Sequence, residues 1–383
     1  MVSVQFIIAS AFSIVPPVIP LLLPEIGVVE IEAISIWSGL VLGVTPLTAG
    51  IMAPVWGRVV DRVDRRGVIL GACAAAAICT LLMSIVTAAW QLLALRFVMG
   101  FFGGHIVAVL ALVTSVCPPS RVGWALGWLS TAQLAGMLLG PLIGGSIADA
   151  LDSYRAPFVA GGCASLLVAL VVLKLPKQRP TQSSESKDAP RMREVLSRYP
   201  DLRTAICVLL LAQLAITSAQ PIVSLYVHSL VGPVDNLATL AGIAFSVIGI
   251  SGLIAAPQVG RVGDRVGQRR LLTIVLGIAA LFTLVQGFAP TYLWFVTERF
   301  VAGVFLAGVI PLANSLVARG VAPEHRGRAF GLTGSATFLG AFVGPLSGGM
   351  VNAHFGLSSV FEVGSAALIV AAAIVYATRA RAP

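Results

Sequence analysis

The chain has 383 residues, of which 57% are hydrophobic and only 11% are charged. Soluble domains carry roughly 25% charged residues, so a water-soluble fold could not cover this much apolar surface. The mean hydropathy of +0.96 supports the same conclusion. The composition therefore excludes a soluble protein and predicts that lipid is the solvent for most of the surface.

Twelve apolar runs follow one another along the chain, each long enough to cross a hydrocarbon core of roughly 30 Å. Backbone polar groups that face lipid have no water to pair with, so every run is expected to be a helix. The runs cover residues 2–23, 36–57, 68–88, 91–115, 122–148, 156–173, 203–229, 238–259, 270–289, 291–317, 327–350 and 357–377.

One long polar connection, residues 174–202, separates six runs from the next six. Its Ser, Pro and charged residues cannot bury a core, which is typical of a flexible linker. The sequence thus predicts an N-terminal six-helix bundle over residues 1–173 and a C-terminal six-helix bundle over residues 203–383. We expect an all-α membrane protein in which the two bundles are related by pseudo-symmetry.

The basic residues indicate how the chain lies in the membrane. With both termini in the cytoplasm, the cytoplasmic loops hold 22 of the 25 Lys and Arg, the outer side holds Arg155, and Arg96 and Arg299 lie inside spans. Cytoplasmic loops of membrane proteins carry such an excess. The net charge of +9 is therefore an orientation signal, and nucleic-acid binding is a poor explanation of it. A multi-pass protein of the cytoplasmic (inner) membrane is expected.

Three motifs recur in the same order in both halves. Residues 53–66 match residues 256–269 at nine of fourteen positions, at an offset of 203. Arg96-Phe-Val-Met-Gly100 corresponds to Arg299-Phe-Val-Ala-Gly303 at the same offset. The run Gly136-x-x-x-Gly140-Pro141-x-x-Gly144-Gly145 returns as Gly340-x-x-x-Gly344-Pro345-x-x-Gly348-Gly349. A parallel duplication of six helices fits a transporter whose site lies between the halves.

These motifs resemble those of the major facilitator superfamily. The Gly57–Arg66 loop is similar to the signature loop between its second and third helices, and the Gly136–Gly145 run to the fifth-helix motif of drug:proton antiporters. The stretch from Trp124 to Pro141 resembles the bacterial multidrug-efflux branch. The resemblance implies twelve spans, a central cavity lined by helices one, four, seven and ten, and a sealing hinge formed by the glycine–proline run.

The repeated loop suggests a conformational latch. We expect Asp61 to sit at the positive N-terminus of the eleventh span and Asp264 at that of the fifth, since carboxylates are favoured there. The resemblance implies the same role for this loop, which would hold the cytoplasmic side shut. The alternative is that the loops are only charged stops. The latch residues are Gly57, Asp61, Arg62 and Arg66, with Gly260, Asp264, Arg265 and Arg269.

Charged residues inside spans are costly in lipid and mark candidate functional sites. Arg96 and Arg299 occupy matched places, and the resemblance puts both near the pathway, although snorkelling to the interface is an alternative. Glu298 is a candidate proton carrier, with simple neutralisation of an arginine as the alternative. His105 has a pKa suited to a proton relay, but nine residues from Arg96 it faces the opposite side of the helix.

The seventh span carries a polar stripe, Gln213, Thr217, Gln220 and Ser224, whose steps of four, three and four keep one helix face. We expect it to line the cavity, with hydrogen bonding between helices as the alternative. Asn314 lies within about 60° of Arg299 around the tenth span and is expected to line the pathway too. Scattered Phe, Trp and Met residues would suit lipophilic cations or neutral drugs.

The sequence therefore predicts a monomeric secondary transporter that exports small amphiphilic compounds by proton antiport, working by alternating access. No cofactor or metal is expected, because the five cysteines lack metal-type spacing and no nucleotide-binding run is present. For the same reasons we do not expect an enzyme. Two alternatives remain: a transporter of a sugar, amino acid or other metabolite, and a non-transporting membrane sensor on the same fold.

Overall fold

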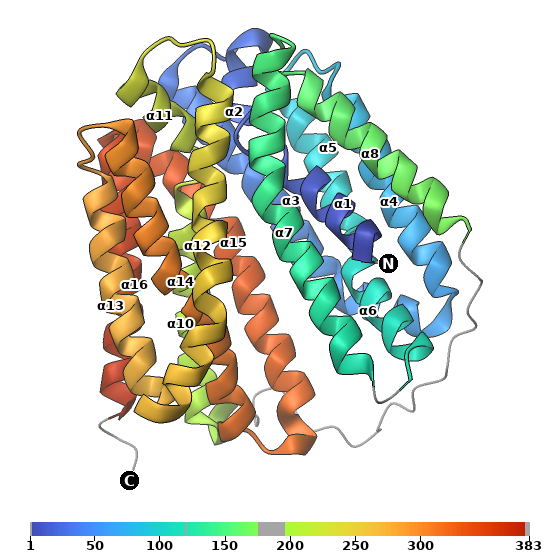
Figure 1. Ribbon diagram of the computed structural model, residues 1–383, viewed down its shortest axis with the longest axis vertical. Coiled ribbons are helices and arrows are strands. Elements are labelled where there is room, and N and C mark those ends of the chain that lie inside the picture. Colours follow the sequence, from blue (N-terminus) through green and yellow to red (C-terminus); the bar gives the residue numbers. More distant parts are fainter. Residues whose placement is uncertain (1, 119–120, 175–195, 380–383) are drawn as a thin grey trace.

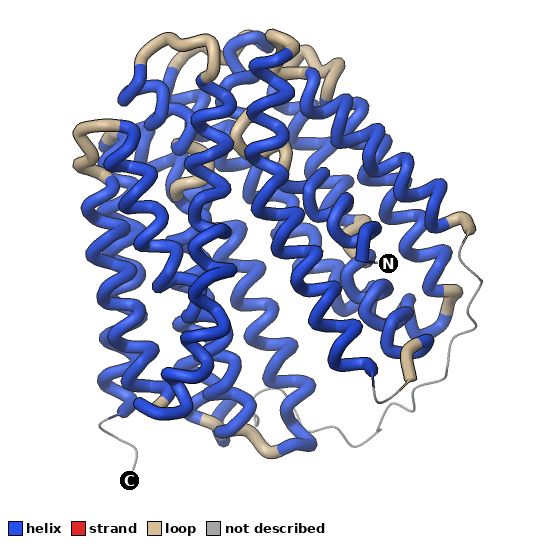
Figure 2. Tube along the Cα trace, viewed as in Figure 1, coloured by secondary structure: helices blue, strands red, loops and turns tan. Residues whose placement is uncertain are grey.

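The computed structural model describes residues 2–118, 121–174 and 196–379, apart from the side chains of residues 61, 105–107, 111, 114–115, 256–257, 260 and 324. Every regular element in these ranges is a helix (Figure 2). Nine helical stretches are long and apolar enough to cross a membrane, and Val2–Ser13, Ala89–Phe101 and Ala156–Val172 are shorter apolar helices. Most of the predicted linker, residues 175–195, lies outside the described part.

The helices form two groups that lie next to each other (Figure 1). The N-terminal half contains α1 (Val2–Ser13), α2 (Ile19–Leu22), α3 (Ile31–Arg62), α4 (Arg65–Met83), α5 (Ala89–Phe101), α6 (His105–Val116), α7 (Val122–Ala150) and α8 (Ala156–Val172). The C-terminal half contains α10 (Pro200–Ser218), α11 (Val223–Val231), α12 (Leu237–Val266), α13 (Gln268–Gln286), α14 (Tyr292–Gly320), α15 (Arg326–Phe355) and α16 (Leu357–Arg379).

Three of the twelve predicted spans are broken rather than continuous. The first divides into α1 and α2, the fourth into α5 and α6, and the seventh into α10 and α11. The first and seventh breaks contain Pro16-Pro17 and Pro221, whose nitrogens cannot donate to the helix. The fourth contains Gly103-Gly104, the residue type that weakens a helix most after proline. The tenth span, α14, stays continuous because Leu306-Ala307 replaces this glycine pair.

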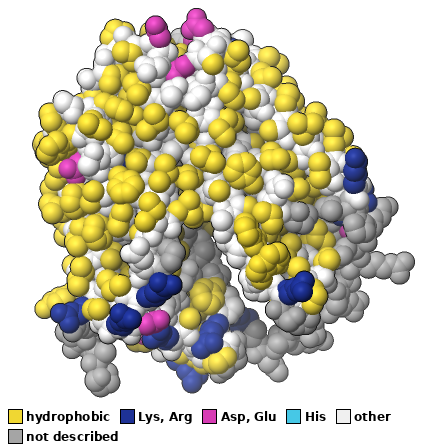
Figure 3. All heavy atoms as spheres, in the orientation of Figure 1, with side chains coloured by type: hydrophobic (Ala, Val, Ile, Leu, Met, Phe, Trp, Pro, Cys, Tyr) yellow, Lys and Arg dark blue, Asp and Glu magenta, His cyan; other side chains and the backbone are white. Residues whose placement is uncertain are grey.

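The two halves meet along two seams, α3 against α15 and α7 against α12. The contacts lie toward the N-termini of α3 and α12, as between Gly39 and Pro345 or between Gly242 and Pro141. At the opposite end, where α3 ends at Arg62 and the chain ends after α16, the surface is hollowed between the halves (Figure 3). We call this the basic end, and the other the sealed end.

The duplicated glycine–proline runs make contacts within each half and also contacts between the two halves. Gly136, Gly140 and Gly144 lie against the backbone of α1 in their own half, and Gly340, Gly344 and Gly348 lie likewise against α10. A Cβ atom at Gly140 would lie 2.7 Å from the Ser10 carbonyl oxygen, and one at Gly344 would lie 2.7 Å from that of Leu214.

The last glycine of each run points the other way, across the seam. Gly145 meets the backbone of Ala238 on α12, and Gly349 meets that of Ser35 on α3. One face of each run therefore packs within its own half, and the other face packs against the opposite half.

Polar contacts in both seams help to close the sealed end. The Asp149 carboxylate at the end of α7 accepts hydrogen bonds from the backbone N–H groups of Ala238 (3.2 Å) and Thr239 (2.7 Å), which begin α12. On the other seam, the Asn352 amide donates to the Ser35 hydroxyl at 2.6 Å. The structure is thus closed at one end and open at the end that carries the repeated charged loops.

Candidate functional site

A cavity of about 710 Å³ lies between the two halves and takes its lining from both. Its walls come from α1, α3, α5 and α7 on one side and from α10, α12, α14 and α15 on the other. Most of the lining is apolar, including Phe12, Phe245, Phe338, Met99 and Met137. A space of this size and character accommodates a drug-sized amphiphile.

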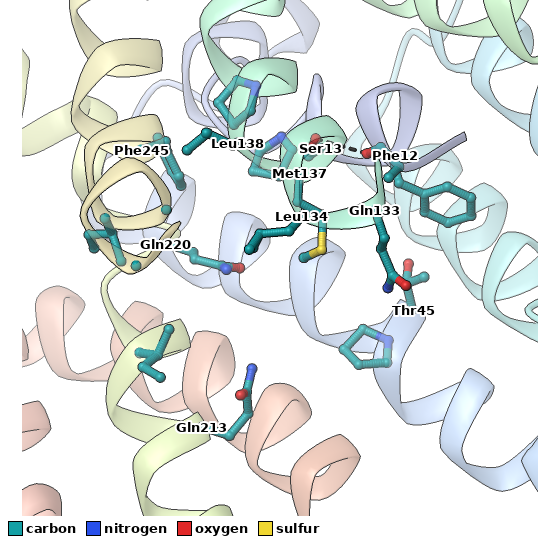
Figure 4. A pocket seen from close by; sticks show the side chains of 18 of the residues that line it. Phe12, Ser13, Thr45, Gln133, Leu134, Met137, Leu138, Gln213, Gln220 and Phe245 are labelled. Atoms are coloured by element: carbon teal, nitrogen blue, oxygen red, sulfur yellow. Dashed lines mark hydrogen bonds between the residues drawn. The ribbon is translucent and has the colours of Figure 1, made fainter. Parts of the chain in front are cut away.

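Glutamines supply most of the polar groups of the cavity. Gln133, Gln213 and Gln220 line it, and none of their side-chain amides has a hydrogen-bond partner among the described residues (Figure 4). Gln5 also lines it, only 4% exposed, and its Oε1 is buried without a partner in the described structure. An amide offers both donors and an acceptor, so these groups are free to bind a guest or water.

The cavity hydroxyls are already engaged. The Ser13 hydroxyl donates to the Gly136 carbonyl (3.0 Å), and the Thr45 hydroxyl donates to the Arg96 carbonyl (3.1 Å). These bonds tie α1 to α7 and α3 to α5. The hydroxyls therefore hold the walls together, whereas the amides face the space.

Arg299 on α14 brings a fixed positive charge to the cavity lining. Its Nε donates to the Ala244 carbonyl of α12 at 2.7 Å, and its Nη1 donates to Gln286 Oε1 of α13 at 3.4 Å. The guanidinium carbon lies 5.3 Å from the centre of the Phe295 ring, within cation–π range. Nη2 has no hydrogen-bond partner among the described residues.

Arg96, the duplicate of Arg299, has a different environment. It is 4% exposed, does not line the cavity, and its Nε and Nη2 are buried without partners in the described structure. The residues at the places of Gln286, Tyr292 and Phe295 are Met83, Ala89 and Leu92. The polar and aromatic shell around Arg299 is therefore missing around Arg96.

Glu298 does not face the cavity. It lies seven residues, close to two helical turns, from Phe305, so the two share a face of α14. The Phe305 ring stacks on Phe282 of α13 with 6.5 Å between ring centres, which turns that face toward α13. Glu298 is 9% exposed, Oε2 has no partner in the described structure, and no ion pair joins it to Arg299. The absence of an ion pair with Arg299 does not favour the alternative of simple neutralisation, and the role of proton carrier stays a prediction.

The polar stripe of the seventh span divides between two environments. Gln213 and Gln220 line the cavity, but Thr217 is buried and its hydroxyl donates to the Gln213 carbonyl (2.8 Å) and the Gly340 carbonyl (3.4 Å). Ser224 is buried and donates to the Pro17 carbonyl at 2.6 Å. The expectation that these two line the cavity was therefore wrong, because each hydroxyl packs against a neighbouring segment and hydrogen-bonds to its backbone, as in the alternative of hydrogen bonding between helices.

Asn314 is half-buried and is absent from the cavity lining. It lies one turn beyond Ile310, which does line the cavity, on the side of the basic end. The side chains of His105 and Asp61, and position 260, lie outside the described residues, so a proton role for His105 and the Asp61 half of the latch stay predictions.

The described latch residues pair within their own halves. Asp264 binds Arg319 at the end of α14 at 2.7 Å, and both side chains are largely exposed. Arg66 donates to the Leu173 carbonyl and Arg269 to the Thr378 carbonyl, so each arginine reaches the end of the last helix of its half. Arg269 also pairs with Asp201. The crossed pairing expected for Asp264 is not formed here, because the halves are separated at the basic end.

The sequence interpretation did not identify Gln5, Gln133 or the hydrogen bonds between the Asp149 carboxylate and the start of α12. The two glutamines interrupt otherwise apolar stretches of α1 and α7, and an amide in a membrane helix was the signal that could have found them. Asp149 sits at the end of a span, where charge is unremarkable, so only its neighbours in space show its contact.

Two pseudo-symmetric helical halves around a central cavity, closed at one end and open at the other, define the class of secondary transporters. The family model of the Major Facilitator Superfamily matches residues 1–238 and 233–383. The chain belongs to this superfamily and is a multi-pass membrane protein.

Curated relatives are similar over nearly the whole chain. "Multidrug resistance protein MdtG" of Proteus mirabilis is 33% identical over 359 residues, 93% of this chain and 89% of the relative. The protein of the same name from Enterobacter lignolyticus is 35% identical, over 94% of this chain and 86% of the relative.

Solved structures share the fold. A point mutant of the nucleoside transporter NupG matches with a TM-score of 0.77 at 16% identity, over 98% of this chain and 99% of that one. A bacterial homologue of the human lysosomal transporter Spinster, described as inward-facing and occupied, also matches with a TM-score of 0.77 at 16% identity, over 98% and 95% of the two chains.

Proposed function

We propose that this protein exports small amphiphilic compounds by proton antiport. The observation that carries the proposal is the central cavity. Its lining is mostly apolar, it contains amides without hydrogen-bond partners among the described residues, and the molecule is hollowed between the halves at the basic end. Relatives that cover most of the chain are named as multidrug resistance proteins. A compound that enters from the basic end would leave from the sealed end once the sealed end opens and the basic end closes.

The basic end is the cytoplasmic side in this proposal. Arg62, Arg121, Arg265, Arg319 and Arg328 are all at helix ends there, as expected for cytoplasmic loops. Both termini are then cytoplasmic, the protein lies in the inner membrane, and the structure is the inward-open state. One chain suffices, because both walls of the cavity come from it.

Alternating access follows from the duplicated seams. In the outward-open state the contacts of Asp149 and Asn352 would break, and the repeated loops would meet across the closed basic end. The latch residues, including Gly57, Arg62 and Arg265, would make their crossed contacts only then. The bundles 1–173 and 203–383 would move as two bodies joined by residues 174–202.

Arg96, Arg299, Glu298 and His105 are the candidates for proton coupling. Glu298 would act at a distance from the compound, since its face of α14 packs toward α13. Gain and loss of its proton would change the packing of α14 beside Arg299.

Proteoliposomes with an imposed pH gradient provide the test. Gradient-driven movement of an amphiphilic dye is expected, together with loss of coupling in Glu298→Gln. Glu362→Gln, a carboxyl on the exposed face of α16, is the matched control and should keep its coupling. Transport that ignores the gradient would refute antiport, and normal coupling in Glu298→Gln would assign the proton to another residue.

A further inference from the structure

We propose that the cavity selects compounds by charge: it takes uncharged or singly anionic amphiphiles and rejects permanent cations. This inference rests on the proposed function and narrows its substrate class. It departs from the expectation of lipophilic cations that the apolar composition raised.

The first support is the charge of the lining. Among the described residues that line the cavity, Arg299 carries the one formal charge, and no carboxylate faces the space. An arginine keeps its charge in proteins. A cation that leaves water for this site would lose its hydration without meeting a counter-charge, which is costly. An anion would instead meet the Nη2 group of Arg299, which has no other partner among the described residues.

The charge of Arg299 is not neutralised by its neighbours. Its hydrogen-bond acceptors are the Ala244 carbonyl and the Gln286 amide, both uncharged, and no described carboxylate lies within ion-pair distance of it. Glu298 follows the other face of α14, toward Phe282 of α13. The aromatic rings of Phe12, Phe245 and Phe338 would attract a cation, but this attraction is weaker than the cost of desolvating an ion.

The amides add a second preference, which is not required for binding. The buried Gln5 Oε1 is an acceptor without a donor, which is costly unless a guest or water supplies one. Gln133, Gln213 and Gln220 offer N–H donors and further acceptors around the same space. A hydroxyl or amide on the compound should therefore strengthen binding further, beyond the anionic or acceptor group and the apolar body that fits the aromatic and methionine walls.

The entrance favours the same class of compound. Lys and Arg side chains gather around the hollow at the basic end, with few acidic side chains among the described residues there (Figure 3). Of the acidic residues beside it, Asp264 is already paired with Arg319. A cleft lined by one sign of charge raises the local concentration of opposite ions, so anions are concentrated and cations repelled.

Tetraphenylborate and tetraphenylphosphonium test the inference, because they have nearly the same size and shape and opposite charges. Purified protein in an uncharged detergent is titrated with each by calorimetry. We expect the anion to bind at least about tenfold more tightly than the cation. The advantage should fall toward one in Arg299→Gln. Equal binding, tighter binding of the cation, or binding of neither would overturn the inference.

A second variant avoids the fold contacts of Arg299. Gln213→Glu places a carboxylate in the cavity wall at a residue whose side chain makes no hydrogen bond to the described protein. It should tighten binding of the cation about tenfold and weaken binding of the anion. Gln258→Glu is the matched control, exposed on α12 and outside the lining, and should leave both affinities unchanged. The same shift in both variants would contradict the proposal.

Binding and transport separate the two claims. Gradient-driven export with a preference for the phosphonium would refute the charge selection and leave the proposed transport in place. Selective binding of the borate by a protein that moves no compound under a pH gradient would refute the proposed transport and leave the charge selection in place.

Discussion

The equivalent arginines of the two halves, Arg96 and Arg299, have different surroundings. Arg299 lines the cavity and is held by Ala244, Gln286 and Phe295, whereas Arg96 is buried with two nitrogens unpartnered in the described structure. The backbone around them is duplicated: Gly100 meets Thr45 and Thr48 of α3, and Gly303 meets Ile248 and Ser251 of α12, at the same offset. The side chains around the charge differ, and so does the helix beyond it, which is broken after Phe101 but continuous in α14.

This difference indicates a division of labour. A charge held by two hydrogen bonds and an aromatic ring is a fixed part of the site, and a new partner can bind its remaining nitrogen without breaking those contacts. A buried charge that lacks partners is costly, so the conformation that holds Arg96 this way is open to replacement by one that supplies an acceptor. We therefore expect Arg299 to set the binding properties and Arg96 to respond to the change of state.

The largest effect is expected from Arg299→Ala. It removes two hydrogen bonds from a charged group and leaves the Gln286 side-chain oxygen without its donor, so the free energy of unfolding should fall by about 2–4 kcal/mol. Thermal unfolding in detergent measures it. Arg96→Ala is the matched comparison and should cost clearly less. Equal losses of stability in the two variants would contradict the proposal that Arg299 and Arg96 have different roles.

The seam glycines should behave alike in both halves, since their surroundings are duplicated. Gly145→Leu and Gly349→Leu each place a side chain against the backbone of the opposite half. Both should weaken the closed sealed end and shift the protein toward the outward-open state, by about tenfold in population or more. Thiol labelling of a cysteine placed near Asn352 reports this shift. Gly277→Leu, which has open space, is the control. A response in only one seam would show that the halves differ there too.

Exchanging the residues beside the two arginines should change the free energy of unfolding in opposite directions. Gln286→Met removes the acceptor of Arg299 and should cost about 1 kcal/mol, whereas Met83→Gln offers Arg96 the same acceptor and should gain about 0.6 kcal/mol. The gain should come with slower transport, because Arg96 would then be held in one state. Measurements of the free energy of unfolding and of the transport rate test both expectations. A Met83→Gln variant that is both more stable and equally fast would contradict the role given to Arg96.

The smallest effect on stability is expected from Asp264→Asn. Its ion pair with Arg319 is largely exposed, and such pairs contribute about 0–1 kcal/mol. If the residue also forms the crossed latch in the other state, transport should nevertheless fall several-fold at unchanged expression. Asp61→Asn is expected to do the same from the other half. Full transport in both variants would leave the repeated loops as simple charged stops.

Much of the fold could be predicted from the sequence because lipid allows few solutions. The apolar runs and the offset repeat were sufficient for the spans and the two halves. The breaks were less visible, since Gly103-Gly104 and Pro221 interrupt helices that a hydrophobicity pattern treats as continuous. The pattern also predicted a stripe that includes Thr217, and this was wrong because the direction in which a residue points depends on neighbouring helices.

The candidate site was less predictable than the fold. Arg299 and Gln213 could be selected from their polarity. The direction in which Glu298 points could not, because adjacent residues on a helix point about 100° apart and only the structure shows which face packs on α13. The contrast between Gln286 and Met83 was readable by aligning the halves at offset 203. Its meaning was not, because only the structure shows that position beside the guanidinium.

The unequal depth of the two seams has a consequence for how a compound arrives. Among the glycines of the two seams, contacts between α3 and α15 reach Gly50 and Phe338, whereas those between α7 and α12 reach Gly249 and Leu138. The hollow beyond them is open on the side seen in Figure 3, which faces the hydrocarbon chains of the cytoplasmic leaflet in the proposed orientation. An amphiphile dissolved in that leaflet can then enter sideways, so its uptake should follow its partition into lipid rather than its concentration in water.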